Sequence, residues 1–347
     1  MEETTNSVES QPSGVKRGKN VRRWLPIALR LVGVGLFLWI ISRVDLSATF
    51  NILRHVDISL VINAILLTVP IVLIRTWRLR IILNSFGVYL TFPHVLLIRL
   101  VGTAAGDMLP GRSGEVVTVA YLQQSGHGLR DPSLTLILDR LFDFVILAIV
   151  AIAGLSLFGQ KLKGQFDELQ GILIISAILF SAIIGILLFV RSRIGWFGTL
   201  IRAKIPDQWH RKLNSWLAKA NPENPAKQTF KWEPILLVKI LGASLLAFSF
   251  LIFRGFLLAK ATGIFLSLPF LAACMAITTL LQLIPISNVM GIGTREVSLV
   301  FLFGLVGITS EYAISFSFMI VFVLLIQDII GLFLWWRYPV GTKLSTI

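Results

Sequence analysis

Charged side chains gather at two glycine- and proline-containing breaks in this 347-residue chain. The first break reads Leu-Pro-Gly-Arg-Ser-Gly-Glu over residues 109–115, and the second ends in Gly-Ile-Gly-Thr-Arg-Glu over residues 291–296. A guanidinium group can bind phosphate through two parallel hydrogen bonds, and the free N–H groups of a helix that starts after such a break also bind anions. The pattern therefore favours a phosphate-binding site, in which carboxylates hold the arginines in place while the site is empty.

A third charged run lies between the two breaks. Asp139 and Asp143 are four residues apart and share one face of a helix, whereas Arg140 lies about 100° round that helix. All these charges could contact a substrate or form structural ion pairs between helices, and the sequence leaves both roles open. Asp107 and Asp328 are further candidates. The predicted binding residues are Arg112, Glu115, Asp139, Arg140, Asp143, Arg295 and Glu296. The residues expected to shape the two breaks are Pro110, Gly111, Gly114, Pro285, Gly291 and Gly293.

The overall composition limits the class of protein. Lys and Arg number 32 against 18 Asp and Glu, a net charge of +14 that would ordinarily suggest a nucleic-acid partner. However, 55% of the residues are hydrophobic and only 14% are charged, against about 25% in soluble domains. The mean hydropathy is +0.82. This composition excludes a soluble nucleic-acid binder and a disordered chain, and the single cysteine, Cys274, excludes a disulfide scaffold.

Long apolar segments predict an all-α polytopic membrane protein with about 6–8 transmembrane helices, since about 20 apolar residues cross a hydrocarbon core. Leu60–Ile74 is a shorter candidate. Arg30, Arg99 and Arg254 lie near the ends of such segments and are expected to extend to the membrane surface. The clearest spans are Trp24–Ile41, Leu141–Phe158, Ile172–Val190, Pro234–Phe253, Phe265–Ile284 and Ile314–Trp336.

Basic residues in short loops predict the orientation of the chain, because such loops stay in the cytoplasm. We expect both termini in the cytoplasm of a cell (inner) membrane, with Trp24–Ile41 kept as a first helix rather than cleaved as a signal peptide. In this arrangement the cytoplasmic segments carry the whole net charge, and the charges embedded in the membrane balance. The charge is counted over residues 1–23, the cluster Arg75, Arg78 and Arg80, residues 191–231 of the loop 191–233, Arg337, and Lys343 of the tail 339–347.

This orientation predicts two broken helical hairpins, over 92–130 and 267–306, because each segment must begin and end on the same face. Both contain the Gly/Pro breaks, which are tolerated at membrane depth where they are buried in protein. The hairpins enter from opposite faces and lie in corresponding places in two membrane halves, 24–190 and 234–338. Interrupted segments in matching positions are typical of an inverted-repeat transporter with its site near the midplane.

In these motifs the chain resembles the lysylphosphatidylglycerol synthase transmembrane region, or flippase-like domain, family over about residues 25–338. The family's Pro-Gly-Arg-x-Gly-Glu motif falls on residues 110–115, and its Gly-x-Gly-x-Arg-Glu motif falls on residues 291–296. Its Glu-Arg-x-x-Asp motif falls on 139–143 with Asp139 in place of Glu, and Thr118 stands where the family often has a basic residue.

The resemblance implies a membrane protein that moves a polar lipid between leaflets. The expected partner is an anionic phospholipid or a polyprenyl-phosphate lipid, with no nucleic acid and with a homo-oligomer left open. The aminoacyltransferase domain that follows the membrane region in larger relatives is not expected here, so lipid aminoacylation is not the predicted activity. A membrane enzyme acting on a lipid-linked phosphate or in glycolipid assembly, with Glu115 or Asp139 as general base, is the alternative. An ion channel is the least favoured function.

The cytoplasmic loop carries one further pattern. Trp209, Leu213, Trp216 and Leu217 fall on one helical face, which is typical of a helix on an anionic membrane surface or of one packed against the protein. The four histidines show no ligand spacing, and the sequence has no Walker A or G-x-G-x-x-G motif. No cofactor and no metal site are therefore expected.

Overall fold

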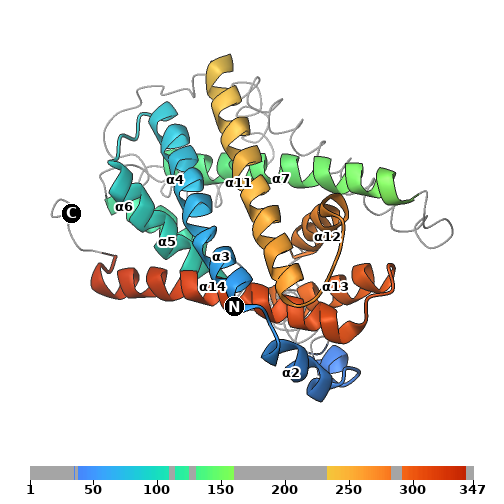
Figure 1. Cartoon of the computed structure of the whole chain (residues 1–347). Coiled ribbons are helices and arrows are strands. Elements are labelled where there is room, and N and C mark those ends of the chain that lie inside the picture. Colours follow the sequence, from blue (N-terminus) through green and yellow to red (C-terminus); the bar gives the residue numbers. More distant parts are fainter. Residues whose placement is uncertain are drawn as a thin grey trace, which may run out of the picture.

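The computed structural model describes residues 35, 38–108, 114–124, 130–159, 233–282 and 291–340. These residues are helical with short connections and contain no strand, which confirms the predicted all-α class (Figure 1). The helices are α2 (Leu46–Arg54), α3 (Ile58–Leu66), α4 (Thr68–Ser85), α5 (Phe92–Met108), α6 (Gly114–Gln124), α7 (Arg130–Gly159), α11 (Pro234–Ala261), α12 (Leu268–Leu281), α13 (Thr294–Gly304) and α14 (Ser310–Arg337).

Three helical stretches of the described chain are long and apolar enough to cross a membrane. They are Ile58–Ser85, which joins α3 and α4, Pro234–Ala261 and Ser310–Arg337, each 28 residues long. At 1.5 Å per residue each reaches about 42 Å, more than a hydrocarbon core requires. A polytopic helical membrane protein is confirmed.

The predicted span Leu60–Ile74 was too short. The helix continues through the polar stretch to Ser85, because Thr76 and Arg78 point into the bundle and are fully buried there. The apolar run alone therefore underestimated the length of this span.

The two predicted hairpins consist of short helices that pack against each other. α5 has 17 residues and α6 has 11, and α12 and α13 have 14 and 11. Gly114 lets α6 lie directly on α5, because a Cβ at this position would stand 2.1 Å from the backbone nitrogen of Gly106. This close approach is the observed structural role of Gly114 in the first break.

The second half of the chain repeats the first at a constant offset in the sequence. The span Ile58–Ser85 and α11 (Pro234–Ala261) have the same length, so their first and last residues are separated by the same offset. That offset also separates the starts of α5 at Phe92 and α12 at Leu268. The connecting sequences Gly-Val-Tyr-Leu-Thr-Phe-Pro (87–93) and Gly-Ile-Phe-Leu-Ser-Leu-Pro (263–269) match at the same offset.

The backbone of these two connections is also the same. Gly87 and Gly263 both have positive φ, 78° and 81°, which favours glycine at the end of a helix. Val88 N–H donates to the carbonyl of Leu83 at 3.0 Å, and Ile264 N–H donates to that of Ala259 at 2.8 Å. The repeat therefore extends to individual hydrogen bonds.

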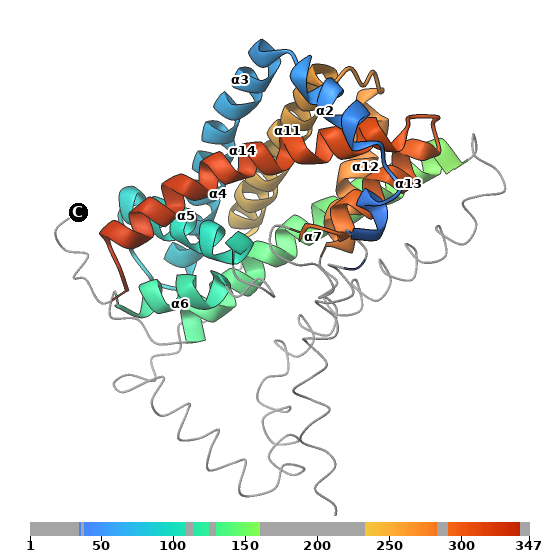
Figure 2. The same ribbon diagram turned by 90° about the horizontal axis from the view of Figure 1, so that it is seen from below.

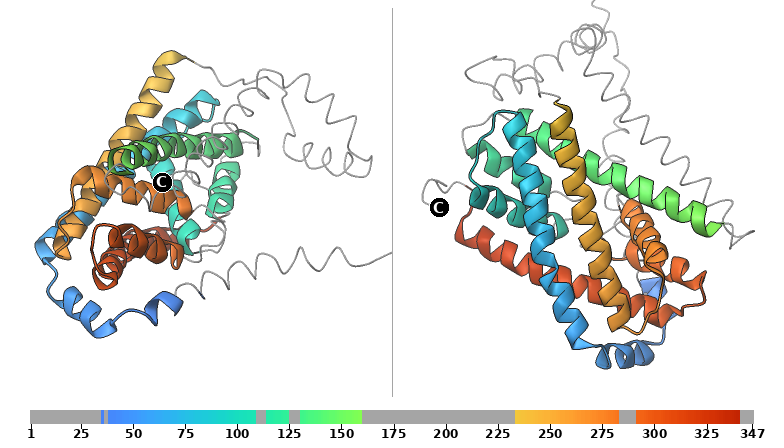
Figure 3. Two further views of the ribbon diagram at one scale, coloured as in Figure 1. Left: turned by 90° about the vertical axis from the view of Figure 1, so that its right-hand side faces the viewer. Right: turned by 45° about the horizontal axis from the view of Figure 1, so that its top comes forward.

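The two halves form an inverted-topology repeat, in which equivalent helices run in opposite directions. Nη1 of Arg78 donates to Ser244 Oγ at 2.6 Å, and Nη1 of Arg254 donates to Thr68 Oγ1 at 3.4 Å. In each bond the arginine is the twenty-first residue of its 28-residue span and the hydroxyl residue is the eleventh of the other span. Such crossed pairing requires α4 and α11 to run antiparallel, as Figure 3 shows. A two-fold axis that exchanges two antiparallel spans is perpendicular to them, so the repeat is an inverted one.

The packing of the remaining helices follows the same two-fold relation between the halves. α5 packs along α14, and its counterpart α12 packs along α7. Figure 2 shows α7 and α14 as two long helices, with α5 and α6 near one end of the bundle and α12 and α13 near the other. Each hairpin contributes to its own apolar core. Leu79, Ile98 and Tyr121 are fully buried in the core around α5, and Leu271, Phe303 and Phe316 in the core around α12.

Small residues bring these helices close, and Gly331 provides a test. A Cβ at Gly331 would lie 2.4 Å from the carbonyl oxygen of Leu100 and 2.7 Å from Cβ of Ala104, so Gly331→Ala must force α14 away from α5. We expect this substitution to lower the free energy of unfolding by about 1–3 kcal/mol. The measurement is thermal unfolding of the purified protein in detergent.

Gly242 in α11 is the matched control, because a Cβ added there meets nothing within 4 Å. Gly242→Ala should leave the melting temperature unchanged or raise it, since alanine favours helix more than glycine. Equal melting temperatures for the two variants would contradict close packing of α14 on α5.

Candidate functional site

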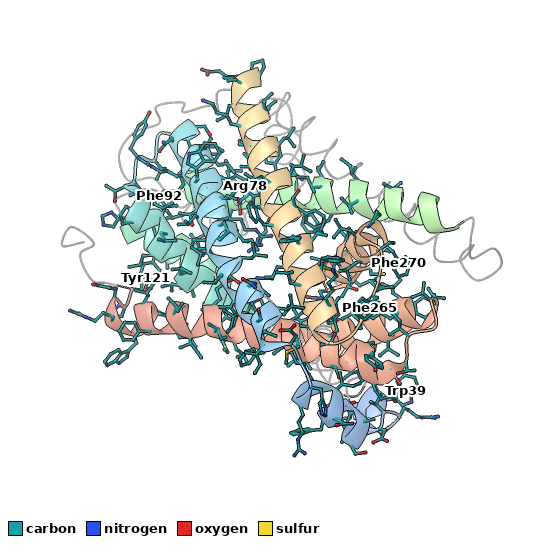
Figure 4. The ribbon with its side chains drawn as sticks, viewed as in Figure 1. Trp39, Arg78, Phe92, Tyr121, Phe265 and Phe270 are labelled. Carbon is teal, nitrogen blue, oxygen red and sulfur yellow. The ribbon has the colours of Figure 1, made fainter. Side chains whose placement is uncertain are left out.

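A fully buried arginine of α4, Arg78, forms the centre of the charged network. Its Nη2 lies 2.7 Å from Oδ1 of Asp139, and its Nη1 lies 2.5 Å from Oδ1 of Asp143, both on α7. The same Nη1 donates to Ser244 Oγ of α11 at 2.6 Å. The other oxygen of Asp139 lies 2.8 Å from Nη1 of Arg99 on α5. Figure 4 shows Arg78 between α4 and α11, where four helices meet.

This network holds helices together. Asp139 and Asp143 share one face of α7, as predicted, and both carboxylates bind the same guanidinium. Both oxygens of Asp139 are engaged, and the residue is 1% exposed. Arg140 is half-buried and its charge acts on Asp139, but the ion pairs of Asp139 are with Arg78 and Arg99. For Asp139 and Asp143 the structure therefore favours the structural alternative over direct substrate contact.

The locations predicted from the sequence are wrong for several arginines. Arg78 does not lie in a cytoplasmic loop but inside α4, and Arg75 lies one turn before it in the same helix. Arg99 and Arg254 do not extend to the membrane surface, since Arg99 is paired with Asp139 and Arg254 is 6% exposed. The physical reason is that a buried carboxylate or a neighbouring helix can receive a guanidinium that hydropathy alone would assign to water. Among the described residues, the buried arginines are then Arg78, Arg254 and Arg295, and the buried carboxylates are Asp139, Glu296 and Asp328.

The second break has a well-defined backbone. Gly291 and Gly293 have φ of 75° and 97°, a region that residues with a Cβ rarely adopt. Glu296 receives a hydrogen bond of 2.6 Å from the N–H of Gly293 and another of 2.6 Å from Oγ of Ser317 on α14. Glu296 therefore caps α13 and fastens it to α14, so both its oxygens are used structurally.

Arg295, the neighbouring motif residue, is 4% exposed at the start of α13, and the opposite charges of Glu296 and Asp107 act on it. Its charge also acts on Arg254, as does that of Arg75. The like charges of Arg75 on α4 and Arg295 on α13 thus both act on the buried Arg254 of α11. A basic cluster of this kind is suited to an anion.

Asp328 is the remaining buried carboxylate of the predicted set. It is fully buried in α14, the charge of Asp107 acts on it, and neither of its oxygens has a hydrogen-bond partner within the described part of the chain. In the same described part, no group of three His, Cys, Asp or Glu residues could hold a metal ion.

Several predicted residues lie outside the described residues. These are Arg112, Pro110 and Gly111 of the first break and Pro285 of the second; Glu115 lies in α6, but its side chain is not described. Thr118 is buried and donates to the carbonyl of Gly114 at 3.2 Å. The predicted span Ile172–Val190, the amphipathic face around Trp209, most of the first span Trp24–Ile41 and the segments 1–23 and 191–232 also lie outside.

Comparison with known families decides the identity of the fold. The profile described as "Lysylphosphatidylglycerol synthase TM region" matches residues 27–331, which is most of the chain. The protein belongs to this family. The predicted resemblance is thereby confirmed, and with it a membrane protein of a family named for a lipid synthase. No curated protein matched the chain. In this family member, the Gly-x-Gly-x-Arg-Glu motif builds the N-terminus of α13, and the Asp-Arg-x-x-Asp motif binds Arg78.

Asp139→Asn tests the structural role of the Arg78 network. The substitution removes one carboxylate from two buried guanidinium groups, so we expect a loss of about 3–5 kcal/mol in unfolding free energy. Thermal unfolding in detergent measures it. Asp328→Asn is the matched control, because that carboxylate accepts no hydrogen bond within the described residues. It should leave the melting temperature unchanged or raise it. A stable Asp139→Asn variant would show that the network does not hold α4 to α7.

Proposed function

We propose that this protein translocates a phosphate-containing polar lipid between the two leaflets of the cell membrane, in the manner of a flippase or scramblase. The observation that carries the proposal is the basic cluster at the interface of an inverted repeat. The charges of Arg75 and Arg295 act on Arg254, and the three residues come from three helices of both halves. Asp139 and Glu296 are committed to ion pairs or to a helix cap, and the charge of Asp107 acts on Arg295. Arg254 is buried and has no salt bridge among the described residues, and a buried guanidinium group without a carboxylate favours an anionic partner.

The antiparallel pair of α4 and α11 provides a route for such a head group. Arg78 and Ser244 lie near one end of the pair, and Arg254 and Thr68 near the other. Ten residues separate the two levels, which corresponds to about 15 Å along a helix. Trp77 and Leu245 are exposed on the outside of the same helices, where acyl chains can follow the head group. Movement of one repeat against the other would open the route to each leaflet in turn.

The same geometry makes the enzyme alternative less attractive. A general base needs a free lone pair directed at the proton that it removes. Asp139 directs both oxygens at arginines, and Glu296 directs both at donors of its own helix and of α14. We therefore do not propose Asp139 as a base; the side chain of Glu115, the other base considered from the sequence, is not described. The anionic phospholipid or polyprenyl-phosphate lipid named from the sequence remains the proposed partner.

A translocation assay tests the proposal. The protein is reconstituted into vesicles that carry fluorescent phosphatidylglycerol in both leaflets, and dithionite is added to quench the outer leaflet. Protein-free vesicles should lose about half of the fluorescence, as geometry requires, and vesicles with wild-type protein should lose nearly all of it. Once the outer leaflet has been quenched, further loss of fluorescence reports lipid that moves from the inner to the outer leaflet. Arg295→Gln should slow this second loss at least about tenfold, because a charged hydrogen-bond donor is lost.

Arg43→Gln is the matched control, since Arg43 is exposed and its guanidinium group lies over the ring of Trp39, away from the basic cluster. It should quench like wild type. If wild-type protein leaves the inner half of the fluorescence intact under these conditions, lipid translocation by this chain is refuted. If Arg295→Gln and wild type have the same rate, translocation stands but the basic cluster does not carry it.

A further inference from the structure

The inverted repeat predicts where the counterions of the second half should lie. α6 and α13 have 11 residues each. The offset between their starts, at Gly114 and Thr294, equals the offset between the starts of α7 at Arg130 and α14 at Ser310. At that offset the positions of Asp139 and Asp143 correspond to Met319 and Val323, which are apolar and belong to the core around α12. The carboxylates of the first half thus have no equivalent in the second.

The arginine, in contrast, is kept. Arg254 is the counterpart of Arg78 at the same level of its span, and its hydroxyl neighbour Thr68 is the counterpart of Ser244. Arg78 has two carboxylates at 2.7 Å or less. Within the described residues Arg254 has no salt bridge, and its hydrogen bond to Thr68 is long, at 3.4 Å. The repeat is therefore symmetric in its arginines and asymmetric in its counterions.

Arg254 stands in an unfavourable environment without an anion. It is 6% exposed, and the like charges of Arg75 and Arg295 act on it. Removing a guanidinium from water is costly unless a carboxylate or another anion is present. A position that keeps the charge but lacks the internal carboxylates is suited to an anion that enters and leaves.

We propose that Arg254 is the residue that binds the phosphate of the substrate, with Arg295 beside it, and that Arg78 is its permanently neutralised counterpart. The proposal rests on the translocation function above and deepens it. The ligand is a phosphodiester or phosphomonoester anion, and its fork-like match to a guanidinium gives two parallel hydrogen bonds. The site lies about 10 Å from the end of α11 that leads into α12, seven residues before Ala261. The inverted repeat thus has one exchangeable anion site and one fixed internal ion pair.

Lipid binding to the full chain in detergent tests the proposal apart from transport. Short-chain phosphatidylglycerol is titrated into the protein, and the melting temperature is followed. Wild type should be stabilised, since a ligand that binds only the folded state raises its stability. Arg254→Gln should weaken binding about 10- to 100-fold, Arg254→Lys should keep part of it, and Arg43→Gln should bind like wild type.

A transplanted counterion is the sharper test. Met319→Asp places a carboxylate at the position that corresponds to Asp139 in the repeat. If it pairs with Arg254 as Asp139 pairs with Arg78, we expect a higher melting temperature without lipid and a loss of lipid binding. Met319→Asn has the same size without the charge and should bind within about twofold of wild type. If Arg254→Gln does not fold, Met319→Asp against Met319→Asn decides the question alone.

Three outcomes would overturn the assignment of Arg254, the lipid as ligand, or translocation alone. Unchanged phosphatidylglycerol binding in folded Arg254→Gln, or in Met319→Asp, overturns the assignment of Arg254. Equal stabilisation by inorganic phosphate and by phosphatidylglycerol at the same concentration rejects the lipid as the source of the anion. Lipid binding that depends on Arg254, combined with intact inner-leaflet fluorescence in the vesicle assay, refutes translocation and leaves the phosphate site standing.

Discussion

A guanidinium group inside an apolar helix bundle must have an anion beside it, and this constraint organises the whole protein. Both halves carry an arginine at the same level of their long span, at Arg78 and at Arg254. The first half meets the constraint with Asp139 and Asp143, which fasten α4 to α7. In the second half the corresponding positions are part of the hydrophobic core. One half is thereby closed by its own charges, and the other is left to be completed from outside.

The antiparallel packing of α4 and α11 joins the two buried arginines to each other's halves. Each helix supplies a hydroxyl to the arginine of the other, at Ser244 and Thr68, so the two halves are joined by equivalent arginine–hydroxyl pairs. The hairpins then pack across, α5 on α14 and α12 on α7, so that each half rests on a long helix of the other. A shift of one half must therefore move both arginines relative to their hydroxyl partners. This is the coupling that alternating exposure of one site requires.

The sequence predicted the helical class, the broken hairpins and the inverted repeat, because these follow from hydropathy and from Gly/Pro breaks. It did not predict the partner of Asp139. Arg75, Arg78 and Arg80 directly follow an apolar run, and the rule for loop charges assigns such a cluster to the cytoplasm. The signal that could have corrected this was present in the internal match of 87–93 with 263–269, which aligns Arg78 with Arg254. The two breaks were a weaker guide, since their spacing differs.

The correction changes what the net charge of +14 means. With Arg75 and Arg78 counted in loops, the charges assigned to the membrane sum to zero, but a sum does not say which charges are paired. Among the described residues, Arg78, Arg254 and Arg295 are buried together with Asp139, Glu296 and Asp328. Of these arginines Arg78 forms salt bridges, whereas Arg254 has none in the described part of the chain. Orientation in the membrane can be achieved with loop charges alone. A buried guanidinium group without an ion pair costs stability, and in the proposed function the phosphate of the lipid would recover that cost on binding.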